Sequence, residues 1–127
     1  MLKIFIIDDD PNILYVLKDY FAEQGEDVLT TMTGRNVLEK IRENFPDIIL
    51  LDVILPEYNG MEILAKIKED QELKDIPVIL ISGQDSSHSQ IDGFKTGADD
   101  YVTKPLDLNV LYERIKKSLP EDRTKKG

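Results

Sequence analysis

Residues Ile48-Ile49-Leu50-Leu51-Asp52 form the stretch from which the fold is inferred. Four consecutive apolar residues are typical of a strand that is buried on both faces, as strands are in parallel sheets. The stretch ends at a carboxylate, and burying a carboxylate is costly unless partners stabilise its charge. Because open parallel sheets bind ligands at the carboxyl ends of their strands, Asp52 is the first candidate for a functional residue.

The rest of the chain alternates between predicted strands and predicted helices. Strands are predicted at residues 3–7, 27–32, 48–52, 76–81 and 100–103. The first predicted helix is capped by Asp10 and runs from Pro11 to a stop at Gly25, and the second runs from Thr33-Gly34 to Pro46. The third follows Gly60. The fourth runs from a cap at Asp85 or Ser86 to Gly97, and the last from a cap at Asp107 to Leu119. This alternation predicts a single α/β domain: a doubly wound, flavodoxin-like, five-stranded parallel sheet with helices on both faces.

Composition excludes several classes of protein. The 127 residues contain 16 basic and 25 acidic side chains, a net charge of −9, and no cysteine. An acidic surface argues against direct binding of nucleic acid, and the absence of cysteine excludes disulfides and thiolate metal sites. No apolar run approaches the roughly 18 residues that a membrane span needs. We therefore expect a cytoplasmic protein that does not enter a membrane.

Polar side chains follow four of the predicted strands. Asp8 and Asp9 come after the first strand, Asp52 ends the third, Ser82 follows the fourth, and Lys104 follows the fifth. Three carboxylates at one sheet edge repel each other, and Mg²⁺ relieves this repulsion because it prefers oxygen ligands. A lysine and a hydroxyl group suit phosphoryl oxygens. The set indicates phosphoryl transfer, with Asp52 as the covalent acceptor.

Further residues stand in a fixed order around this set. They are Leu55-Pro56, Gly60, Ser82-Gly83 and the run from Gly97 to Pro105. Together with the strand-end residues, they make residues 1–119 resemble the receiver domain of two-component response regulators, and leave residues 120–127 as a polar tail or linker. The resemblance implies the strand order 2-1-3-4-5, which is that of the chemotaxis member of the family.

The resemblance also implies a role for each matching residue in the phosphorylation reaction. Asp52 is similar to the phosphoacceptor, and Lys104 to the lysine that contacts the phosphoryl group. Asp8, Asp9 and Asp52, with the backbone carbonyl of Ile54, are similar to the ligands of Mg²⁺, for which Mn²⁺ is able to substitute.

Other positions are implied to act in switching and dephosphorylation. Ser82 and Tyr101 resemble the switch pair, in which the hydroxyl moves toward the phosphoryl group and the ring turns inward. Lys104-Pro105 resembles the family's cis peptide bond. Ile54 and Gln84 are expected to flank the path of the water that removes the phosphate.

The function implied by the resemblance is that of a phosphorelay receiver. A histidine kinase or a histidine phosphotransfer protein would supply the phosphoryl group, and a downstream protein or fused output domain would read the result. The chain would be a monomer or a phosphorylation-dependent dimer. It would catalyse its own phosphorylation and dephosphorylation without being an enzyme that turns over a substrate.

Three alternatives remain beside this interpretation. A phosphorylation-independent interaction domain would lack one of the reactive residues, and all of them are present. An aspartyl-phosphate hydrolase usually carries a second Asp two positions after the first, where this chain has Ile54. A flavin-binding module would need a phosphate-cradling loop after the first strand, where Asp8, Asp9 and Asp10 would repel the flavin phosphate.

Overall fold

The central sheet has five parallel strands in the predicted order. The computed structural model describes residues 1–83 and 93–120. The sheet strands are β1 (Lys3–Ile7), β2 (Asp27–Thr31), β3 (Ile48–Asp52), β6 (Val78–Ser82) and β7 (Asp100–Thr103), and they lie side by side in the order β2-β1-β3-β6-β7. All four neighbouring pairs are parallel. Counted among these five strands alone, the order is 2-1-3-4-5, which confirms the doubly wound, flavodoxin-like fold.

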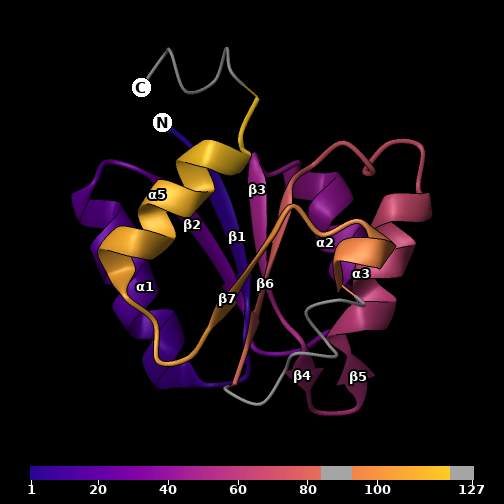
Figure 1. Ribbon diagram of the computed structural model, residues 1–127, viewed down its shortest axis with the longest axis horizontal. Coiled ribbons are helices and arrows are strands. Elements are labelled where there is room, and N and C mark those ends of the chain that lie inside the picture. The colour runs from indigo at the N-terminus through magenta and orange to yellow at the C-terminus, as the bar shows by residue number, and fades with distance from the viewer. Residues whose placement is uncertain (84–92, 121–127) are drawn as a thin grey trace.

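Helices cover both faces of this sheet (Figure 1). Helices α1 (Pro11–Glu23) and α5 (Leu108–Ser118) lie on one face, and helices α2 (Val37–Asn44) and α3 (Gly60–Glu69) lie on the other. A shorter helical segment, residues 93–96, precedes β7. Among the described residues, no helix has both the length and the apolar character needed to cross a membrane.

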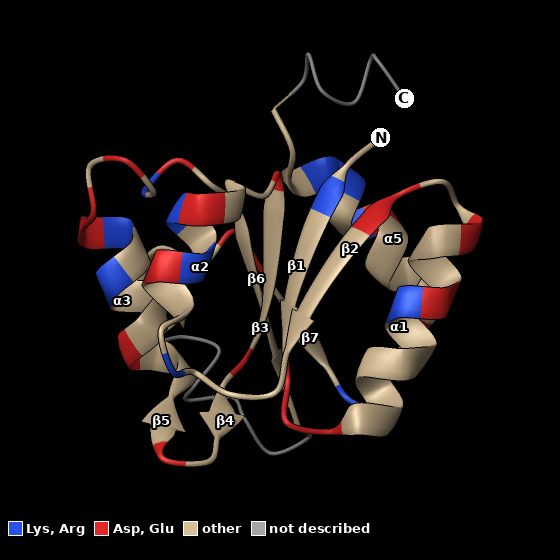
Figure 2. Ribbon diagram, turned by 180° about the vertical axis from the view of Figure 1, so that it is seen from behind, with Lys and Arg blue, Asp and Glu red and all other residues tan. Residues whose placement is uncertain are grey.

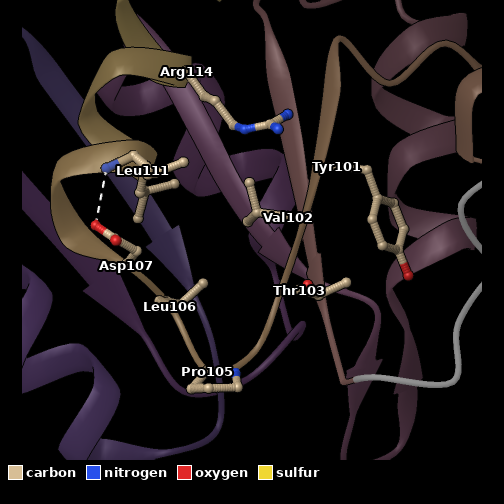
Figure 3. A pocket seen from close by; sticks show the side chains of 9 residues that line it. Tyr101, Val102, Thr103, Pro105, Leu106, Asp107, Leu111 and Arg114 are labelled. Carbon is tan, nitrogen blue, oxygen red and sulfur yellow. Dashed lines mark hydrogen bonds between the residues drawn. The ribbon is translucent and has the colours of Figure 1, made fainter.

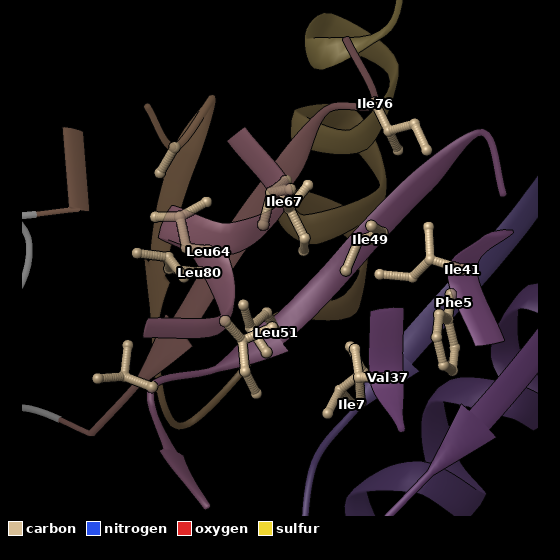
Figure 4. Packing of buried hydrophobic residues seen from close by; sticks show 14 of the residues in the cluster. Phe5, Ile7, Val37, Ile41, Ile49, Leu51, Leu64, Ile67, Ile76 and Leu80 are labelled. Atoms are coloured by element: carbon tan, nitrogen blue, oxygen red, sulfur yellow. The ribbon is translucent and has the colours of Figure 1, made fainter. Parts of the chain in front are cut away.

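Each face of the sheet contributes to its own core. Ile49 and Leu51 of β3 pack with α2 and α3 in one cluster, part of which Figure 4 shows. Ile48 and Leu50 pack with α1 and α5 in the other cluster. All four side chains are fully buried. The continuous apolar run at residues 48–51 therefore has the expected cause, because alternate side chains enter two separate cores.

Three of the predicted helix boundaries are confirmed. The Asp10 side chain accepts a hydrogen bond from the Asn12 amide, and Pro11 is the first residue of α1. Gly25, with a φ of 85°, follows the end of this helix. The Asp107 side chain caps α5 by accepting a hydrogen bond from the Val110 amide. These local sequence patterns therefore fix both ends of α1 and the start of α5.

The predicted start of the second helix is wrong. Helix α2 begins at Val37 and not at Thr33-Gly34, because Asn36 adopts a left-handed conformation with a φ of 57°. Thr33 Oγ1 accepts a hydrogen bond from the Arg35 amide, which holds the preceding residues in a turn. The start of α2 is thus delayed by a tight loop that helical periodicity does not reveal.

The fourth predicted strand is shorter than expected, and a small hairpin was missed. Strand β6 begins at Val78 because the Ile76 amide donates to Leu73 in a turn, and Pro77 has no amide to donate. After β3, the predicted turn-like segment contains the antiparallel strands β4 (Ile54–Leu55) and β5 (Tyr58–Asn59). The predicted cap at Asp85 or Ser86 lies outside the described residues. Gly97, with a φ of 118°, ends the helical segment as predicted.

Candidate functional site

The register of the sheet brings the predicted site residues to one edge. Ile7 pairs with Leu51, so Asp8 and Asp52 follow side by side on neighbouring strands. Ser82 pairs with Thr103, so Lys104 lies just beyond the end of β7. Figure 2 shows acidic segments where β1 and β3 end and a basic segment where β7 ends. Side chains that are separated by 44 to 96 positions in the sequence therefore meet, because the parallel strands all end at the same edge of the sheet.

Lys104 forms ion pairs with both buried carboxylates of the site. Its Nζ lies 3.1 Å from Asp52 Oδ2 and 3.3 Å from Asp8 Oδ2. Asp8 is fully buried, and Asp52 is only 4% exposed. The other Asp52 oxygen, Oδ1, accepts a hydrogen bond from the Ile54 amide at 3.1 Å, and Asp8 Oδ1 accepts one from the Asp10 amide at 2.9 Å. One ammonium group thus faces two carboxylates, so the buried cluster keeps an excess of negative charge.

Burial and charge shift the pKa values of two of these groups. Burial raises the pKa of Asp52 above its ordinary value, and the charge of Asp8 adds to this effect, although the Ile54 amide and Lys104 oppose it. Burial works against the charged form of Lys104, but hydrogen bonding and attraction to Asp52, followed by attraction to Asp8, raise its pKa. Lys104 therefore stays protonated at neutral pH, and the site favours a further positive charge.

The carboxylates have the arrangement that a hard cation requires. One ligand oxygen from each of Asp8, Asp9 and Asp52 lies within 4.8 Å of the other two. Within the described residues, Asp8 Oδ2 is buried and accepts no hydrogen bond, so its contact is the ion pair with Lys104. Asp9 is exposed, which leaves the cluster open to solvent on one side. An open set of carboxylate oxygens with an unsatisfied buried member fits a divalent cation of the magnesium type.

Ser82 and Tyr101 lie on neighbouring strands and are both buried. Ser82 is 5% exposed, and its carbonyl accepts a hydrogen bond of 2.7 Å from the Lys104 amide. Tyr101 is also 5% exposed, and its ring belongs to the core cluster on the α2 and α3 side. Figure 3 shows this ring pointing away from α5. The Tyr101 hydroxyl is buried without a hydrogen-bond partner among the described residues.

Tyr101 and its neighbours in the chain also border a pocket beside α5. This pocket of about 410 Å³ lies between β7, the segment after it and α5 (Figure 3). Arg114 of α5 lines it and pairs with Asp100 at 2.7 Å. Because Asp100 Oδ1 also accepts a hydrogen bond from the Tyr101 amide, the ion pair connects α5 to the backbone that carries this ring.

The remaining predicted positions are found as follows. The side chain of Ile54 is 75% exposed beside Asp52. Gln84 lies outside the described residues. The Lys104–Pro105 peptide bond is cis.

One residue of the site has a structural role that the sequence analysis did not assign. Gly60 is the first residue of α3, and its amide donates to the carbonyl of Val53 at 2.8 Å. A Cβ atom at this position would lie 2.2 Å from the carbonyl oxygen of Asp52. Only glycine allows such a close approach, so Gly60 fixes the backbone that carries Asp52. The sequence signal for this role is a glycine placed directly after the helix cap Asn59.

Comparison with known families identifies the type of domain. The family model of the response regulator receiver domain matches residues 4–116, which include every described residue of the site. The chain belongs to the response regulator receiver family. Receiver domains are the phosphorylation-dependent switches of two-component signalling, so the acidic cluster lies where this family is phosphorylated.

Solved structures of other receiver domains have the same fold. A CheY-like response regulator receiver domain protein from Methanospirillum hungatei is 31% identical, with a TM-score of 0.87, and the match covers 100% of this receiver and 99% of that chain. The BeF3-activated receiver domain of RstA from Klebsiella pneumoniae is 28% identical, with a TM-score of 0.85, and the match covers 94% and 99%. The signal receiver domain of a histidine kinase from Syntrophus aciditrophicus is 30% identical, with a TM-score of 0.85, and the match covers 94% and 90%.

Proposed function

We propose that this receiver domain accepts a phosphoryl group from a phosphohistidine onto Asp52 in a Mg²⁺-dependent reaction. The observation that carries the proposal is the Asp52 carboxylate, buried at the end of β3 and held by Lys104 at 3.1 Å. An oxygen of Asp52 attacks the phosphorus atom, an O–P bond forms and the N–P bond to histidine breaks. The histidine nitrogen leaves with the bonding electron pair.

Lys104 changes its partner during this reaction. Before transfer, its ammonium group neutralises Asp52 and Asp8 together. During transfer, it shifts toward an incoming phosphoryl oxygen and stabilises the charge that develops there. Ser82 lies at the end of β6, which pairs with β7, and its hydroxyl donates to another phosphoryl oxygen.

The carboxylates of Asp8, Asp9 and Asp52, with the backbone carbonyl of Ile54, would hold Mg²⁺ or Mn²⁺. The cation supplies positive charge to the phosphoryl oxygens when it is bound. Asp8 and Asp9 keep this charge close to Asp52, and the bond from the Asp10 amide to Asp8 Oδ1 orients one of these ligands.

The phosphorylated state then changes the surface that the domain presents to a partner. We infer that Ser82 and Tyr101 respond together, because they lie on adjacent strands and Tyr101 contributes a buried ring to one core. A histidine kinase or phosphotransfer protein is the donor, and a downstream protein or fused output domain is the target. The domain acts in the cytoplasm, as a monomer or as a phosphorylation-dependent dimer.

The domain controls the lifetime of its own phosphate. We infer that exposed Ile54, with Gln84, modulates the access of water to the aspartyl phosphate. Residues 1–119 form the receiver in this proposal, and residues 120–127 form a tail or linker.

Intact mass spectrometry after incubation with a small phosphodonor tests the proposal. We expect a phosphoryl adduct on the wild type with Mg²⁺, no adduct without the cation, and no adduct on Asp52→Asn. An adduct that survives in Asp52→Asn would contradict the role of Asp52. A folded wild type that binds Mg²⁺ but takes no phosphoryl group, even from phosphohistidine, would favour a phosphorylation-independent interaction domain. Continuous release of phosphate with turnover of the donor would favour a hydrolase.

A further inference from the structure

Lys68 lies near the C-terminal end of α3, whereas the start of this helix lies beside Asp52. Its ammonium group makes an unusual set of contacts there. Its Nζ donates to the carbonyl of Ile76 at 2.9 Å and to the carbonyl of Lys74 at 3.2 Å, and it pairs with Asp99 Oδ2 at 3.3 Å. The side chain is only 16% exposed. An ammonium group has three donors, and three acceptors use all of them.

These contacts join the two chain segments that lead into β6 and β7. Lys74 and Ile76 belong to the connection between α3 and β6, whereas Asp99 directly precedes β7. The same Asp99 oxygen accepts a hydrogen bond of 2.8 Å from the amide of Val78, the first residue of β6. The Asp99 amide in turn donates to the Val78 carbonyl at 2.9 Å. The starts of β6 and β7 are therefore joined at one carboxylate, which Lys68 holds.

The hydrocarbon stem of Lys68 is also packed. A Cβ atom placed at Gly97 would lie 3.1 Å from Lys68 Cγ, which shows that the stem lies against the glycine backbone. Gly97 ends the helical segment at residues 93–96. An exposed lysine–aspartate pair alone is worth little, but two carbonyl bonds and a packed stem make Lys68 a fixed connection between three segments.

Strands β6 and β7 carry or precede the residues of the proposed site that are not cation ligands. Ser82 ends β6, Tyr101 lies in β7, and Lys104 follows it. Of the proposed cation ligands, Asp8 follows β1 and Asp52 ends β3, and none of these contacts of Lys68 reaches either strand. We propose that Lys68 is a positioning residue that sets β6 and β7, and with them Ser82 and Lys104, relative to the carboxylates. This inference rests on the proposed phosphoryl transfer.

The test compares Lys68→Met with two controls, first by hydrogen exchange of the unphosphorylated protein and then by the rate of phosphorylation. Methionine keeps the stem of Lys68 and removes its donors. Lys66→Met removes an exposed charge from the same helix, and Arg42→Met removes the ion pair between α2 and Asp70 without altering the contacts of Asp99.

Hydrogen exchange without a phosphodonor is the first measurement. Lys68→Met loses the hydrogen bonds from a charged donor, so hydrogen exchange at the Val78 and Asp99 amides should become about tenfold faster in this variant. In both controls, the exchange rates of these amides should stay near those of the wild type. Unchanged exchange at these amides in Lys68→Met would overturn the proposal. Because no phosphoryl group is involved, this result does not depend on whether Asp52 is phosphorylated.

The second measurement separates positioning from stability. We expect Lys68→Met to slow phosphorylation from a small acyl phosphate about tenfold at saturating Mg²⁺, while its affinity for Mg²⁺ stays within about twofold of the wild type. The proposal would be overturned if Arg42→Met, at the same stability as Lys68→Met, lost as much of the phosphorylation rate. It would also be overturned if Lys68→Met lost Mg²⁺ affinity in parallel with its phosphorylation rate. A wild type that takes no phosphoryl group would instead refute the proposed function.

Discussion

Replacing Gly60 with alanine should destabilise the domain and disturb the backbone at Asp52. The new Cβ would lie 2.2 Å from the Asp52 carbonyl oxygen and 2.7 Å from Val53 Cα. Ordinary contact begins at 3.4 Å, so the Asp52 carbonyl oxygen and the new Cβ must separate by about 1.2 Å more, the difference between 3.4 and 2.2 Å. Both neighbours are backbone atoms of buried residues, the last residue of β3 and the residue after it, which no change of rotamer can move.

Two effects set the size of the stability loss expected for Gly60→Ala. Overpacking of this kind costs about 1–3 kcal/mol, and loss of the hydrogen bond from the Gly60 amide to Val53 costs about 1 kcal/mol more. We therefore expect the free energy of unfolding to fall by about 2–4 kcal/mol, a large part of the roughly 5–15 kcal/mol of a small domain.

Urea unfolding followed by circular dichroism measures this loss. Gly83→Ala is the matched control, because a Cβ at Gly83 would meet no atom of residues 1–83 or 93–120 within 4 Å, and its effect should stay within about 0.5 kcal/mol. If Gly60→Ala and Gly83→Ala have the same unfolding midpoint, the close approach of Gly60 to Asp52 does not constrain the site.

Two further predictions concern single side chains. Ile54→Asn should speed the loss of phosphate from Asp52, because the exposed apolar side chain of Ile54 positions no water and an amide does; an unchanged lifetime of the phosphoryl adduct would contradict this role. Tyr112 should make the stability depend on alkaline pH. Burial, followed by its hydrogen bond to Glu26, raises the pKa of Tyr112 to about 12, so the unfolded chain loses the phenol proton at lower pH than the folded protein does. The free energy of unfolding of the wild type should therefore fall between about pH 10 and 12 relative to Tyr112→Phe, by about 1 kcal/mol after solvent screening. Parallel stability curves for the two proteins across this range would show that the phenol does not contribute in this way.

Much of the fold was predictable because the decisive signals are local. The apolar run at residues 48–51 indicates a strand that is buried on both faces, and Asp10 and Asp107 cap helices through bonds to amides two and three residues away. The meeting of Asp8, Asp52 and Lys104 followed from a general property of parallel sheets, which end at one edge. The strand order itself came only from the resemblance to receiver domains.

The features that were missed depend on contacts between distant segments. Helix α2 starts late where a Cβ on Gly34 would meet Tyr58 at 2.8 Å, and Tyr58 belongs to the hairpin that was also missed. Lys68 looks like any surface lysine of a helix, yet its partners lie 6, 8 and 31 residues away. Sequence periodicity cannot report such contacts, because they exist only after the segments have packed.

The two separate cores have a consequence for the evolution of this receiver. Consecutive residues of β7 face opposite layers: Tyr101 packs with the α2 and α3 cluster, whereas Val102 packs against the α1 and α5 cluster. Substitutions in different layers share few neighbours, so their effects on stability should be nearly additive. One helical layer can therefore accumulate changes that suit a new partner, while the other layer, which contains Tyr101, keeps the packing that the proposed switch at Tyr101 would require.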